Sequence, residues 1–237
     1  LGTAIGEYLS WRVSFGLVSL LGLITGAFLF FALKTQAPEQ TGAVAKELSV
    51  LKRPGVWLAL ATTTFGFGGV FVVWTYIAPI LREATGLSPN IMTLVLFIYG
   101  IGLTLGNHVM GRLSDKSLSL SLYGTLGALV ILMALFAFAM TNVWTASVTI
   151  FLLGFAAFGT IPPLQIGIMN AAKGAPNLAS ALNIGAFNLG NAGGAWVGGM
   201  LIDHHFSYPI LALTGALICS SGLIFAFAIY GTGQTAR

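Results

Sequence analysis

The chain has 237 residues, of which 57% are hydrophobic and only 7% are charged, and its mean hydropathy is +0.93. A soluble globular domain carries about 25% charged residues, so the composition excludes one and indicates an integral membrane protein. The formal net charge of +4 comes from basic residues scattered over short polar segments, so it does not indicate nucleic-acid binding. The single cysteine, Cys219, excludes a disulfide framework or a Cys-rich metal site, and we predict no cofactor.

Long apolar runs predict an all-α, polytopic bundle of transmembrane helices, because a span needs roughly 20 apolar residues. Residues 1–10 are too short to span, and we interpret them as the end of a helix that begins before this sequence. Short connections between the later runs predict antiparallel neighbours. Seven full spans are expected, at residues 13–33, 55–81, 91–110, 118–140, 144–169, 178–202 and 208–230.

Residues 34–54 form the longest polar segment. Within it Val44, Leu48 and Leu51 recur at helical spacing, which predicts a short amphipathic helix on the membrane surface. A mobile linker with accidental periodicity is the alternative.

The distribution of basic residues predicts the orientation. If residues 34–54 are cytoplasmic, the loops on the other side hold only Arg12 and Arg82, which is a clear positive-inside bias. The connector and the C-terminus are therefore expected in the cytoplasm. The cytoplasmic set comprises Lys34, Lys46, Lys52, Arg53, Arg112, Lys116, Lys173 and Arg237.

The stretch 106–116, GNHVMGRLSDK, is predicted to be a polar turn between two spans, at one membrane face. Its Gly111, Asp115 and Lys116 fit the G-x-x-x-D-[RK] loop signature of the Major Facilitator Superfamily. Residues 179–199 resemble the eleventh helix of the drug:proton antiporter branch, which includes arabinose and chloramphenicol efflux permeases. The N-terminal residues resemble the end of the fifth helix and the start of the sixth helix in that branch, at Gly2, Gly6, Trp11, Arg12 and Phe15.

This resemblance implies a C-terminal six-helix half preceded by the end of an N-terminal half. Residues 1–33 would end the first half, 34–54 would be the connector, 55–230 the second half and 231–237 a cytoplasmic tail. Such transporters bind substrate between two halves and alternate access by rocking them. The complete protein is expected to be a monomer in the cell (inner) membrane, with the missing N-terminal half as its partner.

The implied function is export of a small organic solute, a sugar or a drug-like molecule, by proton antiport. An importer of the same fold and a membrane scaffold are the alternatives. The sequence has no G-x-S-x-G elbow, no H-E-x-x-H and no phosphate loop, so an enzyme is not expected. Glu83 and Asp203 lie at span ends, and His108 is the one ionisable candidate near a span interior. We therefore expect the proton-coupling carboxylate in the N-terminal half.

The resemblance implies a gating role for Gly111, Arg112, Asp115 and Lys116. Asp115 would cap or pair at a neighbouring helix end and stabilise one access state. A plain solvated loop is the alternative.

Aromatic residues in the span 55–81 are candidates for the substrate cavity. Gly66, Gly68 and Gly69 weaken this helix, and discontinuous helices often mark transporter sites. Phe67, Trp74 and Tyr76 could then stack on a sugar or an aromatic drug, and Pro79 should kink the outer end. Alternatively, the glycines allow tight packing and the aromatic rings face lipid.

Amides supply the remaining cavity candidates. Pro162 and Pro163 should break the span 144–169 and leave Gln165 beside a bent backbone. Asn183, Asn188 and Asn191 share the span 178–202, where amides need partners. Asn188 or Asn191 is predicted to hydrogen-bond the substrate, with hydrogen bonding between helices as the alternative. Gly190, Gly194 and Gly198 recur every four residues and predict close packing with another helix. The pair His204–His205 beside Asp203 is read as an interfacial loop end, with no metal site.

Overall fold

The computed structural model describes residues 10–32 and 47–230, and every regular element in these ranges is a helix. The predicted all-α fold is therefore confirmed. The chain divides into two compact units, at Gly42 and Ala43, so the helix of the first unit is described by itself. The predicted helix stub at residues 1–9, most of the predicted connector and the tail from residue 231 lie outside the described residues.

The first unit contributes one described helix, α2 (Trp11–Ala32). Its 22 residues are apolar on all sides, interrupted by a few small or hydroxyl residues, as expected of a membrane span. It begins and ends within two residues of the predicted span.

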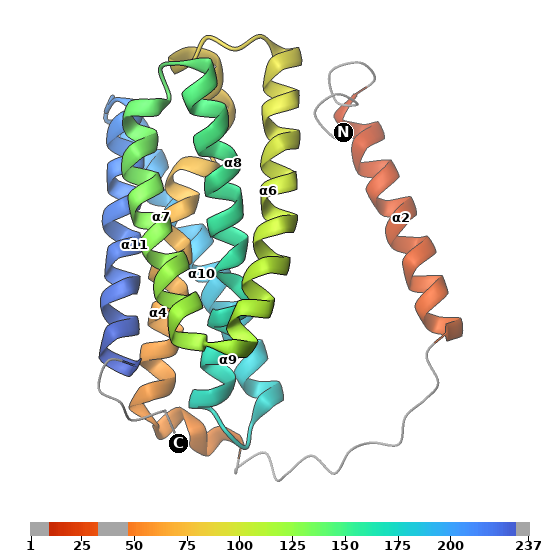
Figure 1. Cartoon of the computed structure of the whole chain (residues 1–237). Helices are drawn as coiled ribbons and strands as arrows, with labels where there is room; N and C mark the ends of the chain where they lie inside the picture. The colour runs from red at the N-terminus through yellow and green to blue at the C-terminus, as the bar shows by residue number, and fades with distance from the viewer. Residues whose placement is uncertain (1–9, 33–46, 231–237) are drawn as a thin grey trace. The chain divides into compact units, whose positions relative to one another are not determined.

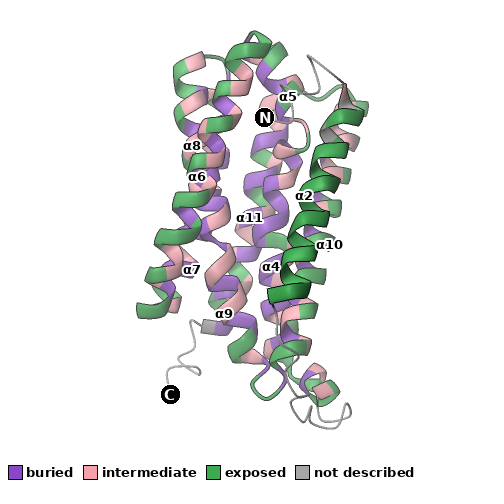
Figure 2. Ribbon diagram, turned by 90° about the vertical axis from the view of Figure 1, so that its right-hand side faces the viewer, coloured by how far each residue is buried: buried purple, intermediate pink, exposed green. Residues whose placement is uncertain are grey.

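The second unit is built around α4 (Pro54–Trp74), which packs mainly against α10 (Pro176–Asp203) and α11 (Tyr208–Tyr230) (Figure 1). On the other side of the bundle, α6 (Pro89–Lys116) packs against α8 (Val143–Gly159). Helix α7 (Leu118–Ala139) packs against α11 and α8. Buried residues run along most of α4, whereas α6 has a largely exposed outer side (Figure 2).

Helix α4 continues without a break through Gly66–Gly69, so the predicted interruption at these glycines is wrong. The alternative, tight packing, is what these glycines provide. A methyl group on Gly68 would lie 2.7 Å from the Gly190 carbonyl oxygen, and one on Gly69 would lie 2.6 Å from the Cys219 sulfur. Because glycine has no side chain, the backbones of neighbouring helices approach closely here. The van der Waals contacts between these backbones stabilise the bundle and compensate for the low helix propensity of glycine.

The outer end of this span is irregular, as predicted from Pro79. The α-helix ends at Trp74, and a short helical turn, α5 (Ile77–Pro79), leads into a π-helix, η2 (Ile80–Ala84). Pro79 has no N–H to donate to the carbonyl of Thr75, so the regular pattern of hydrogen bonds cannot continue here. The predicted kink is therefore confirmed.

The predicted break before Pro162 and Pro163 is also confirmed. Helix α8 ends at Gly159, and α9 (Ile161–Ala171) begins two residues later with the prolines in its first turn, where missing N–H groups are tolerated. Thr160 at the break is fully buried, and its hydroxyl donates to the carbonyl of Ala156 at 2.7 Å.

The predicted turn at residues 106–116 is wrong. Helix α6 runs through this stretch to Lys116, and Ser117 alone separates it from α7. Arg, Leu and Lys favour helix, and a charged helix end can extend past the hydrocarbon boundary without a turn. Ser117 is extended, and its hydroxyl accepts from the Leu120 amide, so the helix boundary is capped there.

The predicted amphipathic helix of the connector is only partly seen. Val44 lies outside the described residues, and the chain from Ser49 to Lys52 is a short 3₁₀ helix, η1. It buries Val50, which is not on the predicted apolar face, and leaves Leu48 of that face 49% exposed. Val50 packs with residues of α4, α9 and α10, so this end of the connector is part of the second unit's core and does not lie loosely on a membrane surface.

Six of the seven predicted spans correspond to helical segments long and apolar enough to cross a membrane, within the described residues. The seventh, α10, has 28 residues and so has the length, but it carries glycines and asparagines that lower its hydropathy. Those residues make the contacts of the candidate site.

Candidate functional site

A chain of four hydrogen-bonded polar side chains joins α4, α9 and α10 inside the bundle. The Thr63 hydroxyl donates to Asn183 Oδ1 at 2.8 Å, and Asn183 Nδ2 donates to Gln165 Oε1 at 2.8 Å. Gln165 Nε2 in turn donates to the hydroxyl of Ser180 at 2.9 Å. Thr63 and Asn183 are fully buried, so both depend on these partners. We call this set the polar chain.

The polar chain explains the position of Gln165. The break at Thr160 starts a new helix, and Gln165 lies in the second turn of that helix, facing α10. Sequence reasoning selected Gln165 but treated Asn183 only as a neighbour of the other asparagines, and it missed Thr63 and Ser180. No local signal marks a threonine within the run Thr62–Thr64 as the partner of an amide 120 residues away.

Aromatic rings form the next layer along the same two helices. Phe67 lies one turn after Thr63, and Phe187 lies one turn after Asn183. The two rings meet edge to face with centroids 4.9 Å apart, and Phe71 lies 5.7 Å from Phe67. Phe67 is 5% exposed, so it does not face lipid as the alternative interpretation required.

Asn191 lies one turn beyond Phe187 on α10. Its side-chain oxygen is buried and accepts no hydrogen bond from a described protein group. A buried acceptor without a donor costs free energy, about 1–3 kcal/mol in general, so this oxygen is poised to accept a hydrogen bond. Thr63 with Asn183, Phe67 with Phe187, and then Asn191 thus occupy successive turns, which we call the α4–α10 ladder.

The other aromatic candidates hold helices together. Trp74 stacks on Tyr99 of α6, with ring centroids 3.8 Å apart and planes at 18°. The Tyr76 hydroxyl donates to the carbonyl of Ala195 at 2.9 Å, which ties the irregular end of α4 to α10. The structure therefore groups Phe67, Gln165 and Asn191 around the α4–α10 ladder and gives Trp74 and Tyr76 partners within the protein.

Asn188 lies apart from the α4–α10 ladder. It is exposed, and its amide nitrogen donates to the carbonyl of Ile184 on its own helix at 2.9 Å. It directly follows Phe187, so its side chain is rotated by about 100° around the helix axis from that ring of the ladder.

The three packing glycines of α10 lie along its contact with α4. A methyl group on Gly190 would lie 3.2 Å from the Gly68 Cα and would collide with the carbonyl oxygen of Thr64. One on Gly194 would collide with the carbonyl oxygen of Gly68, and one on Gly198 would lie 2.6 Å from that of Val72. This close approach brings the polar and aromatic side chains of the two helices into contact.

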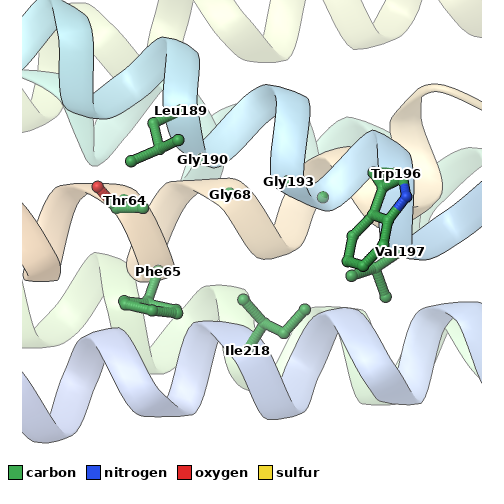
Figure 3. Close-up of a pocket in the computed structure, with 10 residues that line it drawn as sticks. Thr64, Phe65, Gly68, Leu189, Gly190, Gly193, Trp196, Val197 and Ile218 are labelled. Atoms are coloured by element: carbon green, nitrogen blue, oxygen red, sulfur yellow. The ribbon is translucent and has the colours of Figure 1, made fainter.

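A groove of about 180 Å³ flanks the same seam (Figure 3). Its walls come from α4, α10 and α11 and are almost wholly apolar, with Phe65, Trp196 and Ile218 among them. Thr64, its hydroxyl-bearing residue, donates to the carbonyl of Ala186 at 3.3 Å. Besides Thr64, the described polar side-chain group of the groove is the indole N–H of Trp196, which is 67% exposed, so the groove is a weaker substrate site than the buried α4–α10 ladder.

The predicted gating residues occupy the last two turns of α6. Arg112, Asp115 and Lys116 are exposed and Gly111 is half-buried. In the described part of the chain the ion pair formed is Arg82–Glu83, at 3.9 Å, so Asp115 has no described basic partner. Its role as a gate stays a prediction.

The membrane-length helices, two of them broken, enclose amides and aromatic rings, an arrangement that is typical of secondary transporters among polytopic membrane proteins. The chain belongs to the Major Facilitator Superfamily, whose family model matches residues 1–175 and 60–236. The predicted family is thus confirmed, and it is a family of membrane transporters, not of enzymes.

Curated relatives agree with this assignment. The chain is 39% identical over 225 residues to "Inner membrane transport protein YdhP" of Escherichia coli (strain K12), covering 95% of this chain and 58% of the relative. It is 32% identical to "Putative transporter AraJ" of the same strain, covering 98% and 59%. A "Probable sugar efflux transporter" of Helicobacter pylori (strain ATCC 700392 / 26695) is 29% identical, covering 96% and 57%. The chain therefore spans less than two thirds of the length of these relatives.

Proposed function

We propose that this chain is part of a secondary active transporter of the inner membrane that exports a small organic solute, a sugar or a drug-like molecule. Export is proposed to occur by proton antiport with alternating access. A relative named as a probable sugar efflux transporter supports this assignment. The proposed orientation, with the connector and the C-terminus in the cytoplasm, rests on the positive-inside bias.

The observation that carries the proposal is the buried, unpaired side-chain oxygen of Asn191 at the end of the α4–α10 ladder. Sugars and hydroxyl-bearing drugs offer hydrogen-bond donors beside an apolar ring face. Phe67 and Phe187 would contact that face, and Asn191 would accept the donor. The polar chain fixes Gln165 and the register of α10, so it holds this arrangement in place.

The proposal places part of the site outside this chain. The described acidic residues are Glu47, Glu83, Asp115 and Asp203, and each lies at or beyond a helix end. Proton antiport needs a titratable group that water reaches alternately from both sides. We therefore propose that an N-terminal half, as the longer relatives suggest, supplies the coupling acid and the opposite wall of the cavity.

The transport activity is tested in everted vesicles that contain the protein from its native membrane. A pH gradient is imposed, and a panel of sugars and aromatic drugs is added one at a time. A transported solute should accumulate only while the gradient lasts and should release protons as it moves. Accumulation that is indifferent to the gradient would contradict proton antiport, and accumulation in the opposite orientation only would indicate an importer.

Asn191→Ala should lower solute transport at limiting concentration by about tenfold, because a hydrogen bond to a buried neutral group contributes about 1.5 kcal/mol at most. The loss should appear mainly as a higher KM. Asn177→Ala, an exposed asparagine in the first turn of the same helix, is the matched control and should transport normally. Equal transport by both variants would remove Asn191 from the site.

A further inference from the structure

A cluster of basic residues at one end of the bundle has no role in the proposed transport site. Arg53 immediately precedes α4, and its Nη1 donates to the carbonyl of Lys173 at 3.0 Å and to that of Ala171 at 3.4 Å. These carbonyls lie at the last residue of α9 and two residues beyond it, where a cation is favourable. Lys52 precedes Arg53 in the chain. Tertiary contact thus brings Lys173 to Lys52 and Arg53, although Lys173 follows Arg53 by 120 residues in sequence.

The positive charge of this cluster is not neutralised within the described residues. The side chains of Lys52, Arg53 and Lys173 are exposed, and the described ion pair, Arg82–Glu83, involves none of them. The Arg82–Glu83 pair lies in η2, which follows the other end of α4. The cluster therefore presents net positive charge to whatever surrounds this end of the bundle.

The cluster lies where a membrane span begins. Pro54, directly after Arg53, starts a helix apolar enough to cross a membrane, and Lys173 follows the end of another such segment. Trp57, one turn into the span, is 58% exposed. Its indole nitrogen donates to the carbonyl of Leu51 at 2.8 Å, so the ring is held next to Lys52. Trp at this depth is typical of the boundary between head groups and acyl chains.

We propose that Lys52, Arg53 and Lys173 bind the phosphate of an anionic phospholipid, with the exposed face of Trp57 against the glycerol and upper acyl chain. Basic pockets between membrane helices are suited to such head groups. The adjacent apolar ring favours a lipid over a free anion, because a free phosphate has nothing to bury against it. Val50 and the Arg53–carbonyl bonds hold the end of the connector in place beneath the lipid.

The test is native mass spectrometry of the detergent-solubilised protein titrated with phosphatidylglycerol or with phosphatidylcholine of the same acyl chains. The wild-type protein should retain phosphatidylglycerol preferentially. Lys52→Gln/Lys173→Gln should bind it about 25-fold more weakly, because each basic side chain near an anionic surface contributes about fivefold. Neither side chain makes a described hydrogen bond, so the fold should be kept, and a thermal unfolding scan verifies this.

Arg82→Gln/Lys116→Gln removes the same charge outside the cluster and should bind phosphatidylglycerol like the wild type. Equal weakening of both double variants would overturn the proposal, because binding would then follow net charge alone. Unchanged binding by Lys52→Gln/Lys173→Gln would overturn it as well. Inorganic phosphate is added as a competitor at millimolar concentration. Displacement of the lipid at that concentration would mean a free-phosphate site and would contradict a lipid one, whereas retention supports the lipid.

Discussion

Gly190→Ala is expected to prevent α4 and α10 from packing and to abolish most of the folded protein. The added methyl group would collide with the carbonyl oxygen of Thr64 and lie 3.2 Å from the Gly68 Cα. Both are backbone atoms in the middle of a long helix, so neither can move aside without shifting the helix. Overpacking typically costs 1–3 kcal/mol, and we expect about 3 kcal/mol or more here, because side-chain rearrangement cannot relieve the collision.

Gly193→Ala is the matched control, in the same helix and one turn away. A methyl group there meets no atom within 4 Å, and alanine favours helix over glycine by about 1 kcal/mol. This variant should unfold at the same or a higher temperature than the wild type. Thermal unfolding in detergent, followed by circular dichroism, measures both variants. Similar melting temperatures for the two would show that α4 and α10 are not as close as the structure has them.

Asn183→Ala is expected to destabilise the bundle by about 1–3 kcal/mol and to reduce transport. The substitution removes two hydrogen bonds and leaves Thr63 and Gln165 without their partner inside the protein. Hydrogen bonds between membrane helices average only about 0.6 kcal/mol, so most of the loss should come from the two groups left unpaired. Gln165 and α10 would also lose their fixed register, which should displace Asn191.

A double-mutant cycle separates these contributions. Asn183→Ala and Gln165→Ala are measured singly and together, by unfolding in detergent–denaturant mixtures. The double variant should be clearly less destabilised than the sum of the two single variants, since the side chains share one hydrogen bond. Asn188→Ala, whose amide bonds only its own helix, should change stability by less than about 0.5 kcal/mol. Strict additivity would mean that the polar chain does not act as a unit.

The basic cluster lies just outside the start of α4, whereas the α4–α10 ladder lies within that helix, so the two proposals can fail independently. Loss of lipid binding in Lys52→Gln/Lys173→Gln would leave the assignment of Asn191 untouched. Loss of transport in Asn191→Ala would say nothing about the lipid.

Hydrophobicity and backbone chemistry are local properties, so the sequence alone determined the features that depend on them, namely the membrane spans and the helix breaks. Long apolar runs identified the spans, and Pro79 and the pair Pro162–Pro163 identified two helix breaks, because a missing N–H acts within one turn. Local sequence features did not predict the structure where helix packing or helix propensity outweighs a local signal such as glycine or charge. Gly66–Gly69 stays helical because neighbouring helices press against it, and residues 106–116 stay helical because charge alone does not end a helix.

Pairings between distant residues were decided only by the tertiary structure. The sequence supplied Gln165, Asn183 and Asn191 as polar groups that need partners inside a membrane. It could not say that Thr63 pairs with Asn183 across 120 residues, or that the Asn191 oxygen is left without a donor. Likewise, in the sequence Arg53 is one of several basic residues that obey the positive-inside rule. Only the structure shows that it hydrogen-bonds the chain just after α9. Hydrogen bonds depend on the relative placement of whole helices to within a fraction of an ångström, and that placement arises from the summed packing of the bundle rather than from any one segment.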